Sequence, residues 1–256
     1  MQGVEGVLLD VDGVLVQSWR ALPGAPEALA ALRAAKISVR FLTNTTALTR
    51  AELGERLHDA GLEVEMDEVL TAPAAAAAYL RAKHPGARCY LIAKGDVAED
   101  LDGVELVDED ADVVLIGGAE ENFTYDNLNR AFRMLMDGAA LVTMHRNLYW
   151  KTDEGLTLDA GAFVVALEHA SGAAAVVTGK PAKAFFAEAL RALGAPAEKV
   201  AMVGDDVDND VLAAQDAGLV GVLVRTGKFT ESALEHASGT PDLIVDSVRD
   251  VPALLG

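Results

Sequence analysis

The sequence predicts an α/β protein with a doubly wound, Rossmann-like parallel-sheet core, into which a second α/β domain is inserted. Two observations lead to this prediction. Short apolar runs alternate with segments of helical periodicity, and the links between them are short, which is typical of parallel sheets covered by helices. The sequence pattern changes near residue 71, and after it expected helices and strands alternate again. We expect the core at residues 1–75 and 176–256 and the inserted domain at 76–175.

The segment from Gly6 to Val14, GVLLDVDGV, predicts the first strand of the core. The apolar run at 7–9 is long enough for a buried strand, and Asp10, Asp12 and Gly13 follow it. Residues two apart in an extended segment face the same side, so both carboxylates can reach one site at the end of the strand. An exposed acidic turn is the alternative, because Asp and Gly are common turn residues.

The first core segment continues with alternating helices and strands. Residues 25–36 are rich in Ala and Leu at helical spacing, which predicts an amphipathic helix. The β-branched residues 37–43 predict a second strand, and residues 49–60 predict a helix that Gly61 closes. The polar sequence TNTT at 43–46 contains residues that commonly cap helices.

The same alternation runs through the inserted domain and the second core segment. In the inserted domain we expect a helix reaching residue 83, strands at 89–93, 104–107 and 112–116, a helix at 125–136, a strand at 141–144 and a helix at 160–170. In the core we then expect strands at 174–178, 200–203, 220–224 and 243–245, and helices at 182–193, 207–217, near 232–236 and at the end of the chain.

The composition is globular, with 51% hydrophobic and 24% charged residues, and the apolar runs are too short to cross a bilayer. The net charge of −19 argues against nucleic acid or an anionic membrane as a partner, since both require a basic surface. Cys89 is the single cysteine, which excludes an intramolecular disulfide, and we expect it to be a small buried hydrophobe. The N-terminus lacks the basic region of a signal peptide, so we expect a soluble, cytoplasmic protein.

Polar side chains directly follow four of the expected strands. They are Asp10 with Asp12, Thr43 with Asn44, Lys180, and Asp205 with Asp206 and Asp210. Each group has a simpler explanation when taken singly: a helix cap, a solvated lysine or an acidic loop. Because parallel strands bring their carboxyl ends to one edge of a sheet, we expect the four groups to converge there.

These residue types suit phosphoryl transfer assisted by a cation. Crowded carboxylates raise one another's pKa values unless a cation intervenes, and oxygen ligands from Asp10, Asp205 and a backbone carbonyl suit Mg²⁺. Lys180, the Thr43 hydroxyl and backbone N–H groups can hold a phosphoryl group. One carboxylate can then attack phosphorus to form an aspartyl phosphate, and the carboxylate two residues on can transfer protons.

The motifs resemble those of the haloacid dehalogenase (HAD) superfamily of phosphatases over essentially the whole chain. DVDGV at 10–14 is similar to the first motif, Thr43-Asn44 to the second, Gly179-Lys180-Pro181 to the third, and the stretch from Gly204 to Asp210 to the fourth. The spacing resembles the type IIA, or NagD-like, subclass, which has a large α/β cap between the second and third motifs. FLTNTT, LTLDAGAFVVALEHASG, VTGKP and VRTGKF resemble the phospholysine phosphohistidine inorganic pyrophosphate phosphatase group.

The resemblance implies the roles of three acids. Asp10 is expected to be the nucleophile and a Mg²⁺ ligand, and Asp205 to complete the metal site. Asp12 is expected to be the general acid and base and to bind Mg²⁺ through its backbone carbonyl. Members of the nearest group often carry Ser at the position of Asp12, so the substrate of this chain need not be theirs.

The resemblance also implies which residues bind phosphate. Thr43 and Asn44 are expected to hold it, and Lys180 to neutralise both the phosphate and the nucleophile. Asp206 and Asp210 are expected to orient bound water or Lys180 rather than to bind the ion directly.

The inserted domain gives weaker signals. His145, Arg146, Tyr149, Trp150 and Lys151 cluster in a segment that resembles the substrate-facing loop of the cap. Trp150 is the first candidate for a stacking or anion-binding role, and an ordinary cap surface or core is the alternative. Caps of this size often contribute to dimers in the resembling subclass, so a homodimer is possible.

We therefore expect a Mg²⁺-dependent phosphohydrolase acting on a small phosphorylated metabolite. The bond can be a phosphate ester, a phosphoramidate of lysine or histidine, or the anhydride of pyrophosphate, because the cap selects the leaving group. Two non-enzymatic alternatives stay open. One is a receiver-like phospho-acceptor, a class about half as long as this chain, and the other is a catalytically silent binding protein, against which the intact Asp12 argues.

Overall fold

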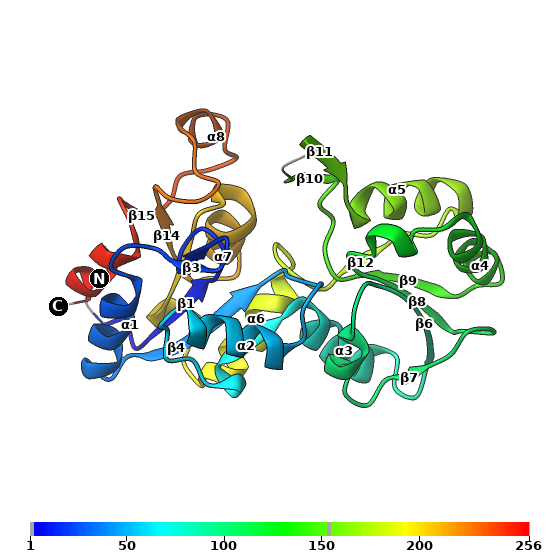
Figure 1. The fold of residues 1–256 in the computed structure, drawn as a ribbon, viewed down its shortest axis with the longest axis horizontal. Helices are drawn as coiled ribbons and strands as arrows, with labels where there is room; N and C mark the ends of the chain where they lie inside the picture. Colours follow the sequence, from blue (N-terminus) through cyan, green and yellow to red (C-terminus); the bar gives the residue numbers. More distant parts are fainter. Residues whose placement is uncertain (1–2, 153–154, 256) are drawn as a thin grey trace. The chain divides into compact units, whose positions relative to one another are not determined.

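The computed structural model describes residues 3–152 and 155–255, and the side chains of 150–152 lie outside that description. Within it the chain forms two compact units, each an α/β unit built around a parallel sheet (Figure 1). Unit 1 contains Met1–Thr43, Arg50–Leu70 and Lys180–Gly256, and unit 2 contains Asn44–Thr49 and Thr71–Gly179. The predicted α/β class with parallel sheets is confirmed. The expected limits of the inserted domain, 76–175, stay a prediction.

The sheet of unit 1 is doubly wound about its first strand. Its six strands are β1 (Gly6–Asp10), β4 (Ser38–Thr43), β5 (Val69–Thr71), β13 (Val200–Gly204), β14 (Val220–Val224) and β15 (Leu243–Val245). They lie in the order β15-β14-β13-β1-β4-β5, and the neighbours from β15 to β4 pair in parallel. The chain builds first on one side of β1 and later on the other. Open α/β sheets hold their ligands where the strand order reverses in this way, at the carboxyl ends of the strands.

Helices cover both faces of this sheet, as strand alternation requires. Val7, Leu9 and Phe41 point to one face, where α1 (Ala25–Ala34), α2 (Arg50–Asp59) and α9 (Val251–Leu254) complete the apolar core. On the other face lies α6 (Lys183–Leu193), and a side-chain carbon added to Gly6 would fall 2.2 Å from a methyl group of Leu193. β1 is therefore buried on both faces, which fixes the position of Asp10 at its end.

Unit 2 has its own five-stranded parallel sheet, in the order β12-β9-β8-β6-β7. The strands are β6 (Arg88–Ile92), β7 (Glu105–Leu106), β8 (Val113–Ile116), β9 (Ala140–Thr143) and β12 (Val176–Val177). The helix α3 (Ala72–Lys83) packs on one face with Cys89, which is buried as expected. The helices α4 (Tyr125–Met136) and α5 (Ala160–Ser171) pack on the other face.

Several features differ from the sequence expectations. No strand is expected at β5 (Val69–Thr71), and β12 (Val176–Val177), which is expected in the core, pairs with β9 in the sheet of unit 2. The pair β2 (Val16–Gln17) and β3 (Arg20–Ala21) forms a hairpin after Asp12, and β10 (Tyr149–Thr152) pairs with β11 (Gly155–Leu158) in unit 2. The expected helix at 207–217 begins as a π-helix (Val207–Leu212) before α7 (Ala213–Asp216). Apolar periodicity does not separate a π-turn from an α-turn over so few residues. The short helix near the C-terminus, α8, spans Glu231–Glu235.

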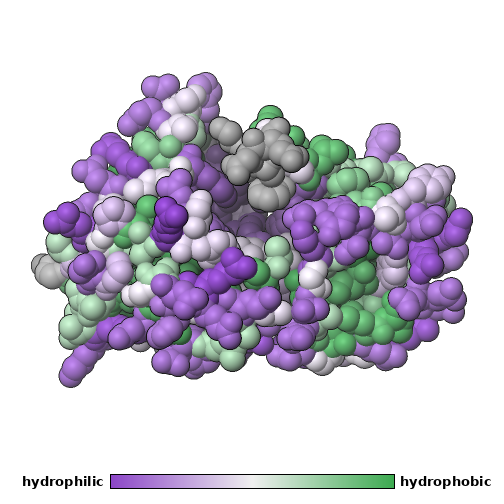
Figure 2. Space-filling view, in the orientation of Figure 1, coloured by the Kyte–Doolittle hydropathy of each residue, from purple (hydrophilic) through white to green (hydrophobic). Residues whose placement is uncertain are grey.

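Hydrophilic residues cover much of the visible face of both units, in keeping with the net charge of −19 (Figure 2). None of the described helices is both long and apolar enough to span a bilayer.

Candidate active site

A buried lysine joins two carboxylates in unit 1. Lys180 Nζ lies 2.7 Å from Asp10 Oδ1 and 2.7 Å from Asp210 Oδ1. The three side chains are 5%, 8% and 2% exposed, respectively. The backbone N–H of Val11 also donates to Asp10 Oδ1 at 2.8 Å. Three segments therefore meet in one charged cluster. They contribute Asp10 at the end of β1, Lys180 three residues before α6, and Asp210 in the π-helix.

Asp205 follows β13, the neighbour of β1, and its two oxygens have different surroundings. Oδ2 accepts the backbone N–H of Lys228 at 2.7 Å, whereas Oδ1 is buried without a hydrogen-bond partner among the described residues. Gly13 and Gly227 press against the same carboxylate, since a side-chain carbon at either would fall 1.9 Å or 1.8 Å from Oδ2. Both glycines have positive φ, +81° and +60°. A larger residue at either position would displace Asp205.

Asp206 caps the π-helix. Its Oδ1 accepts the backbone N–H of Asn209 at 3.0 Å, and its Oδ2 accepts the side-chain amide of Asn209 at 3.0 Å. Burial alone would raise the pKa of Asp206, but these two hydrogen bonds lower it overall. The N–H of Asp206 donates to Asp210 Oδ2 at 3.3 Å, so Asp206 helps to aim Asp210 at Lys180.

Burial and crowding raise the pKa values of the clustered acids. Burial raises the pKa of Asp10 by more than the charge of Lys180 lowers it. Burial, with Asp210 nearby, raises the pKa of Asp205 to about 6, and burial, with Asp10 nearby, raises the pKa of Asp210 to about 7. Burial opposes the charge on Lys180, but its two carboxylate partners raise its pKa, so it stays an ammonium. An added cation would relieve the repulsion among the acids.

The three buried carboxylates fit a divalent cation. One oxygen from each of Asp10, Asp205 and Asp210 lies within 4.8 Å of the others. All the donors are oxygen atoms, as Mg²⁺ prefers, and the buried Oδ1 of Asp205 is an acceptor that a cation would satisfy. The expected contribution of Asp12 is a backbone carbonyl, which stays a prediction.

Asp12 and Thr43 lie in unit 1 close to Asp10, whereas Asn44 belongs to unit 2. Thr43 is buried at the end of β4, one residue beyond Leu42, which pairs with Asp10 in the sheet. Asp12 lies past the end of β1, and its side chain is exposed where that of Asp10 is buried. The two acids of the first motif therefore have different environments, because Asp10 is buried and Asp12 is exposed to solvent.

The expected residues of unit 2 do not share one environment. His145 is buried, and Arg146 forms an ion pair with a glutamate of α5. Tyr149 is exposed on β10. The side chains of Trp150 and Lys151 lie outside the described residues.

A fifth strand end contributes residues that the expected set leaves out. The loop after β14 runs from Thr226 to Lys228, and the Thr226 hydroxyl donates to the carbonyl of Gly13. Together with the bond from Lys228 to Asp205, this contact fixes the loop against the site. The polar sequence RTGK directly after the expected strand at 220–224 is the signal that would have identified it.

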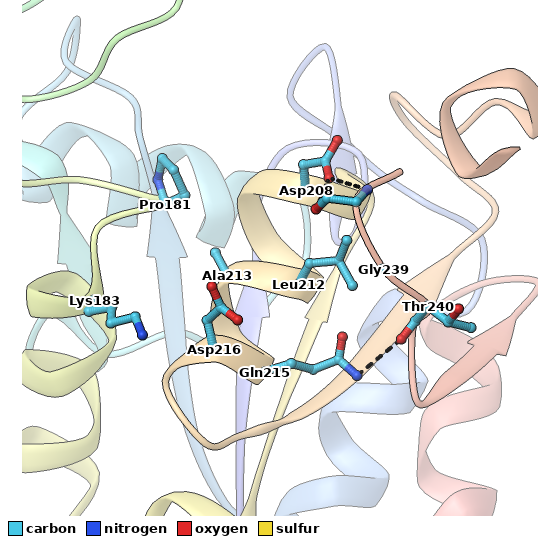
Figure 3. Close-up of a pocket in the computed structure, with 10 residues that line it drawn as sticks. Pro181, Lys183, Asp208, Leu212, Ala213, Gln215, Asp216, Gly239 and Thr240 are labelled. Atoms are coloured by element: carbon cyan, nitrogen blue, oxygen red, sulfur yellow. Dashed lines mark hydrogen bonds between the residues drawn. The ribbon is translucent and has the colours of Figure 1, made fainter. Parts of the chain in front are cut away.

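A surface pocket of about 520 Å³ lies beside the π-helix of unit 1, on the side that Asp208 faces (Figure 3). Its polar groups bond to one another: Ser238 donates to Asp208, and Gln215 donates to the carbonyl of Thr240. Asp10, Asp205 and Asp210 do not line it. We therefore assign the chemistry to the buried cluster and not to this pocket.

Known proteins resemble this chain over nearly its whole length. Two family models, described as haloacid dehalogenase-like hydrolase and HAD-hydrolase-like, match residues 7–107 and 177–251. Haloacid dehalogenase-like hydrolase domain-containing protein 2 of Homo sapiens is 42% identical over 96% of this chain and 93% of its own length. Phospholysine phosphohistidine inorganic pyrophosphate phosphatase of Homo sapiens is 39% identical over 100% and 95%, respectively. The structure of NagD from E. coli K-12 matches with a TM-score of 0.88 at 27% identity, over 96% of this chain and 98% of that one.

We expect Mg²⁺ to stabilise the protein more at pH 8 than at pH 5. In the metal-free protein Asp205 and Asp210 keep their protons up to pH values of about 6 and about 7, so a cation must displace protons below those values. Acids with a raised folded-state pKa lower the stability as the pH rises from about 4 to about 7, and a bound cation offsets that loss. The difference in Tm with and without saturating MgCl₂, measured at each pH, tests this expectation.

Two variants control this experiment. Asp205→Asn should lose most of the Mg²⁺ effect, whereas Asp208→Asn removes an exposed acid nearby and should keep it. A Tm shift that does not grow with pH, or that is equal in both variants, would contradict the assignment of the cation to this cluster.

Proposed function

Since this chain belongs to the haloacid dehalogenase-like hydrolases of type IIA, the NagD-like group, and is a phosphatase, we propose that it hydrolyses a small phosphorylated metabolite through a Mg²⁺-dependent aspartyl-phosphate mechanism. One observation supports this proposal above the others. Buried Lys180 holds Asp10 at 2.7 Å, and in the same cluster Asp205 has a buried oxygen without a hydrogen-bond partner among the described residues. The receiver-like and silent-binding alternatives are set aside.

Asp10 is the proposed nucleophile in the first step. Both hydrogen bonds that it accepts from described residues, from Lys180 and Val11, end on Oδ1, which leaves Oδ2 to form the new bond to phosphorus. As the bond from phosphorus to the leaving group breaks, Asp12 gives a proton to the departing oxygen. Its exposed position suits a group that exchanges protons with water. Lys180 balances the charge that develops around phosphorus.

Water completes the cycle in the second step. Asp12, now a carboxylate, takes a proton from water as the water oxygen attacks phosphorus, and the bond from phosphorus to Asp10 breaks. Inorganic phosphate leaves and both acids return to their starting states. Thr43 and Asn44 are the proposed phosphate ligands. Asp10, Asp205 and the Asp12 carbonyl would hold Mg²⁺, which when bound neutralises charge on the phosphoryl oxygens.

Substitution of the two acids should separate their roles. Asp10→Asn should abolish hydrolysis of p-nitrophenyl phosphate, because an amide does not attack phosphorus. Asp12→Asn should lower kcat by roughly 10²–10⁴, since it removes only proton transfer, and should leave the Mg²⁺-induced Tm shift close to that of the wild type. Steady-state assays with and without Mg²⁺ measure both effects. Full activity in the Asp10 variant would contradict the aspartyl-phosphate mechanism. Full activity in the Asp12 variant would contradict its role in proton transfer.

The bond that is broken is proposed partly from a relative. The human protein that is 39% identical is named for phospholysine, phosphohistidine and inorganic pyrophosphate. We therefore include phosphoramidates and pyrophosphate beside phosphate esters as candidate substrates. A panel of phosphorylated metabolites with pyrophosphate, phospholysine and phosphohistidine, ranked by kcat/KM, decides among them. A kcat/KM at least about tenfold higher for an ester than for the other compounds would reject both alternatives.

A homodimer formed through unit 2 is also part of the proposal. Exposed apolar side chains gather around β10, β11 and the neighbouring α5, with Leu148 50%, Leu156 74%, Leu158 62% and Val165 42% exposed. An apolar cluster of this kind is typical of an interaction surface. Light scattering during gel filtration should give twice the chain mass of 26.8 kDa, and Leu156→Glu should give the monomer. A monomeric wild type at high concentration would reject the dimer.

A cytoplasmic location, with small phosphorylated compounds as the partners, completes the proposal. The single cysteine is compatible with a reducing compartment. Fractionation of cells that express the natural chain tests the location.

A further inference from the structure

The loop after β14 brings a second lysine to the buried acids. Its anchors are the bond from the Thr226 hydroxyl to the carbonyl of Gly13 and the bond from the Lys228 N–H to Asp205 Oδ2. Gly13 lies three residues after the end of β1, and Asp205 directly follows β13. The backbone at Lys228 is thus fixed relative to the reacting carboxylate, while the side chain extends from it.

The two lysines of the site have opposite surroundings. Lys180 is 5% exposed and bonds two carboxylates at 2.7 Å. Lys228 is 65% exposed, and its ammonium lies 3.6 Å from Asp206 Oδ2, too far for a hydrogen bond. The N–H groups of the Lys228 ammonium donate to none of the described residues, whereas its backbone N–H donates to Asp205. The charge of Lys228 nevertheless acts on four acids of the site, which are Asp206, Asp210, Asp205 and Asp10.

A hollow beside Lys228 provides room for a ligand group. It has a volume of about 150 Å³ and is lined by Asp205, Asp206, Lys228, Phe229 and Thr230, among others. A water molecule occupies roughly 30 Å³ in the liquid, so the hollow accommodates a group of several heavy atoms. Among the described residues that line the hollow, three are aspartates and one, Lys228, is a cation.

We propose that Lys228 is a specificity-determining residue, which binds negative charge on the leaving group of the substrate. The inference rests on the proposed phosphohydrolase function. Lys180 is committed to the nucleophile and is assigned to the transferred phosphoryl group, so it does not distinguish one leaving group from another. The side chain of Lys228 is exposed outside the buried cluster, its ammonium can donate hydrogen bonds to a ligand, and its backbone is held by Asp205. A carboxylate or a second phosphate on the leaving group would accept charge-assisted hydrogen bonds from it.

A merely structural role for Lys228 is the competing explanation. In that case the ammonium only offsets the charge of Asp206, and its removal would slow all substrates alike. The proposed role instead predicts a change in the preference between substrates. The two explanations therefore differ in a ratio of kcat/KM values, which errors in protein concentration do not affect.

The test compares two compounds that differ in one charge. In 2-phosphoglycolate the leaving group carries a carboxylate where ethyl phosphate carries a methyl group. The wild type should prefer phosphoglycolate, and Lys228→Met should lower the ratio of the two kcat/KM values by about 10- to 100-fold, the value of one charge-assisted contact. Lys228→Arg should keep most of the preference. Where turnover is slow, the inhibition constants against p-nitrophenyl phosphate hydrolysis give the same ratio.

Lys199→Met is the matched control. Lys199 is also an exposed lysine paired with an acid, Glu5, but it lies before β13, at the opposite end of the strand. Lys199→Met therefore removes the same charge from the same unit and should leave the ratio of the two kcat/KM values unchanged. No preference in the wild type, an unchanged ratio in Lys228→Met, or an equal fall in Lys199→Met would overturn the proposal. Each of these outcomes leaves hydrolysis intact, whereas failure of the proposed function would appear as full activity in Asp10→Asn.

Discussion

The ion pair of Lys180 with Asp10 and Asp210 is the interaction on which the rest of the structure depends. An ammonium that is 5% exposed is tolerable only because two carboxylates lie 2.7 Å away. Removal of one partner from such a buried pair costs about 3–5 kcal/mol, because the remaining charge is left without compensation. In the sequence, unit 2 separates Asp10 from Lys180 and Asp210. The charged cluster therefore ties the two halves of unit 1 together and also positions Asp10, the proposed nucleophile.

The same burial that holds the cluster together also makes it unfavourable without a cation. Burial first, and the neighbouring acid second, raise the pKa of Asp205 to about 6 and that of Asp210 to about 7, and Lys180 offsets only part of this effect. Gly13 and Gly227 pack against Oδ2 of Asp205, and its Oδ1 has no hydrogen-bond partner among the residues that the structure describes. Groups placed against their own electrostatic preference in this way are typical of functional sites. Here the arrangement leaves an oxygen available to the Mg²⁺ that we propose for this site.

The sequence was sufficient for the fold class and for the proximity of Asp10 and Asp205, because parallel pairing brings the ends of β1 and β13 together. It did not account for the way Lys180 reaches them, since the strand before it, β12, belongs to the sheet of unit 2. It was insufficient for features that depend on local backbone strain. The β2–β3 hairpin turns at Ser18 and Trp19, both with positive φ and neither a residue that signals such a turn. A contact with another element holds the turn, since the Arg56 guanidinium lies 5.0 Å from the Trp19 ring. The loop with Lys228 follows a strand end like the four expected groups, but its contact with Asp205 is made by the backbone N–H, which the residue type does not reveal.

The contrast between the two lysines shows how one core can serve different substrates. In the proposed mechanism Lys180 contacts the phosphoryl group that every phosphate monoester or anhydride shares, and its two buried carboxylate partners fix its position. A group fixed in this way stabilises the transferring phosphoryl group equally for all substrates and so contributes nothing to selection. Selection requires a group whose interaction is absent from the unliganded site and is made with one leaving group but not with another. An exposed ammonium on an anchored loop has that property, and the loop reaches the site without disturbing the buried ion pair.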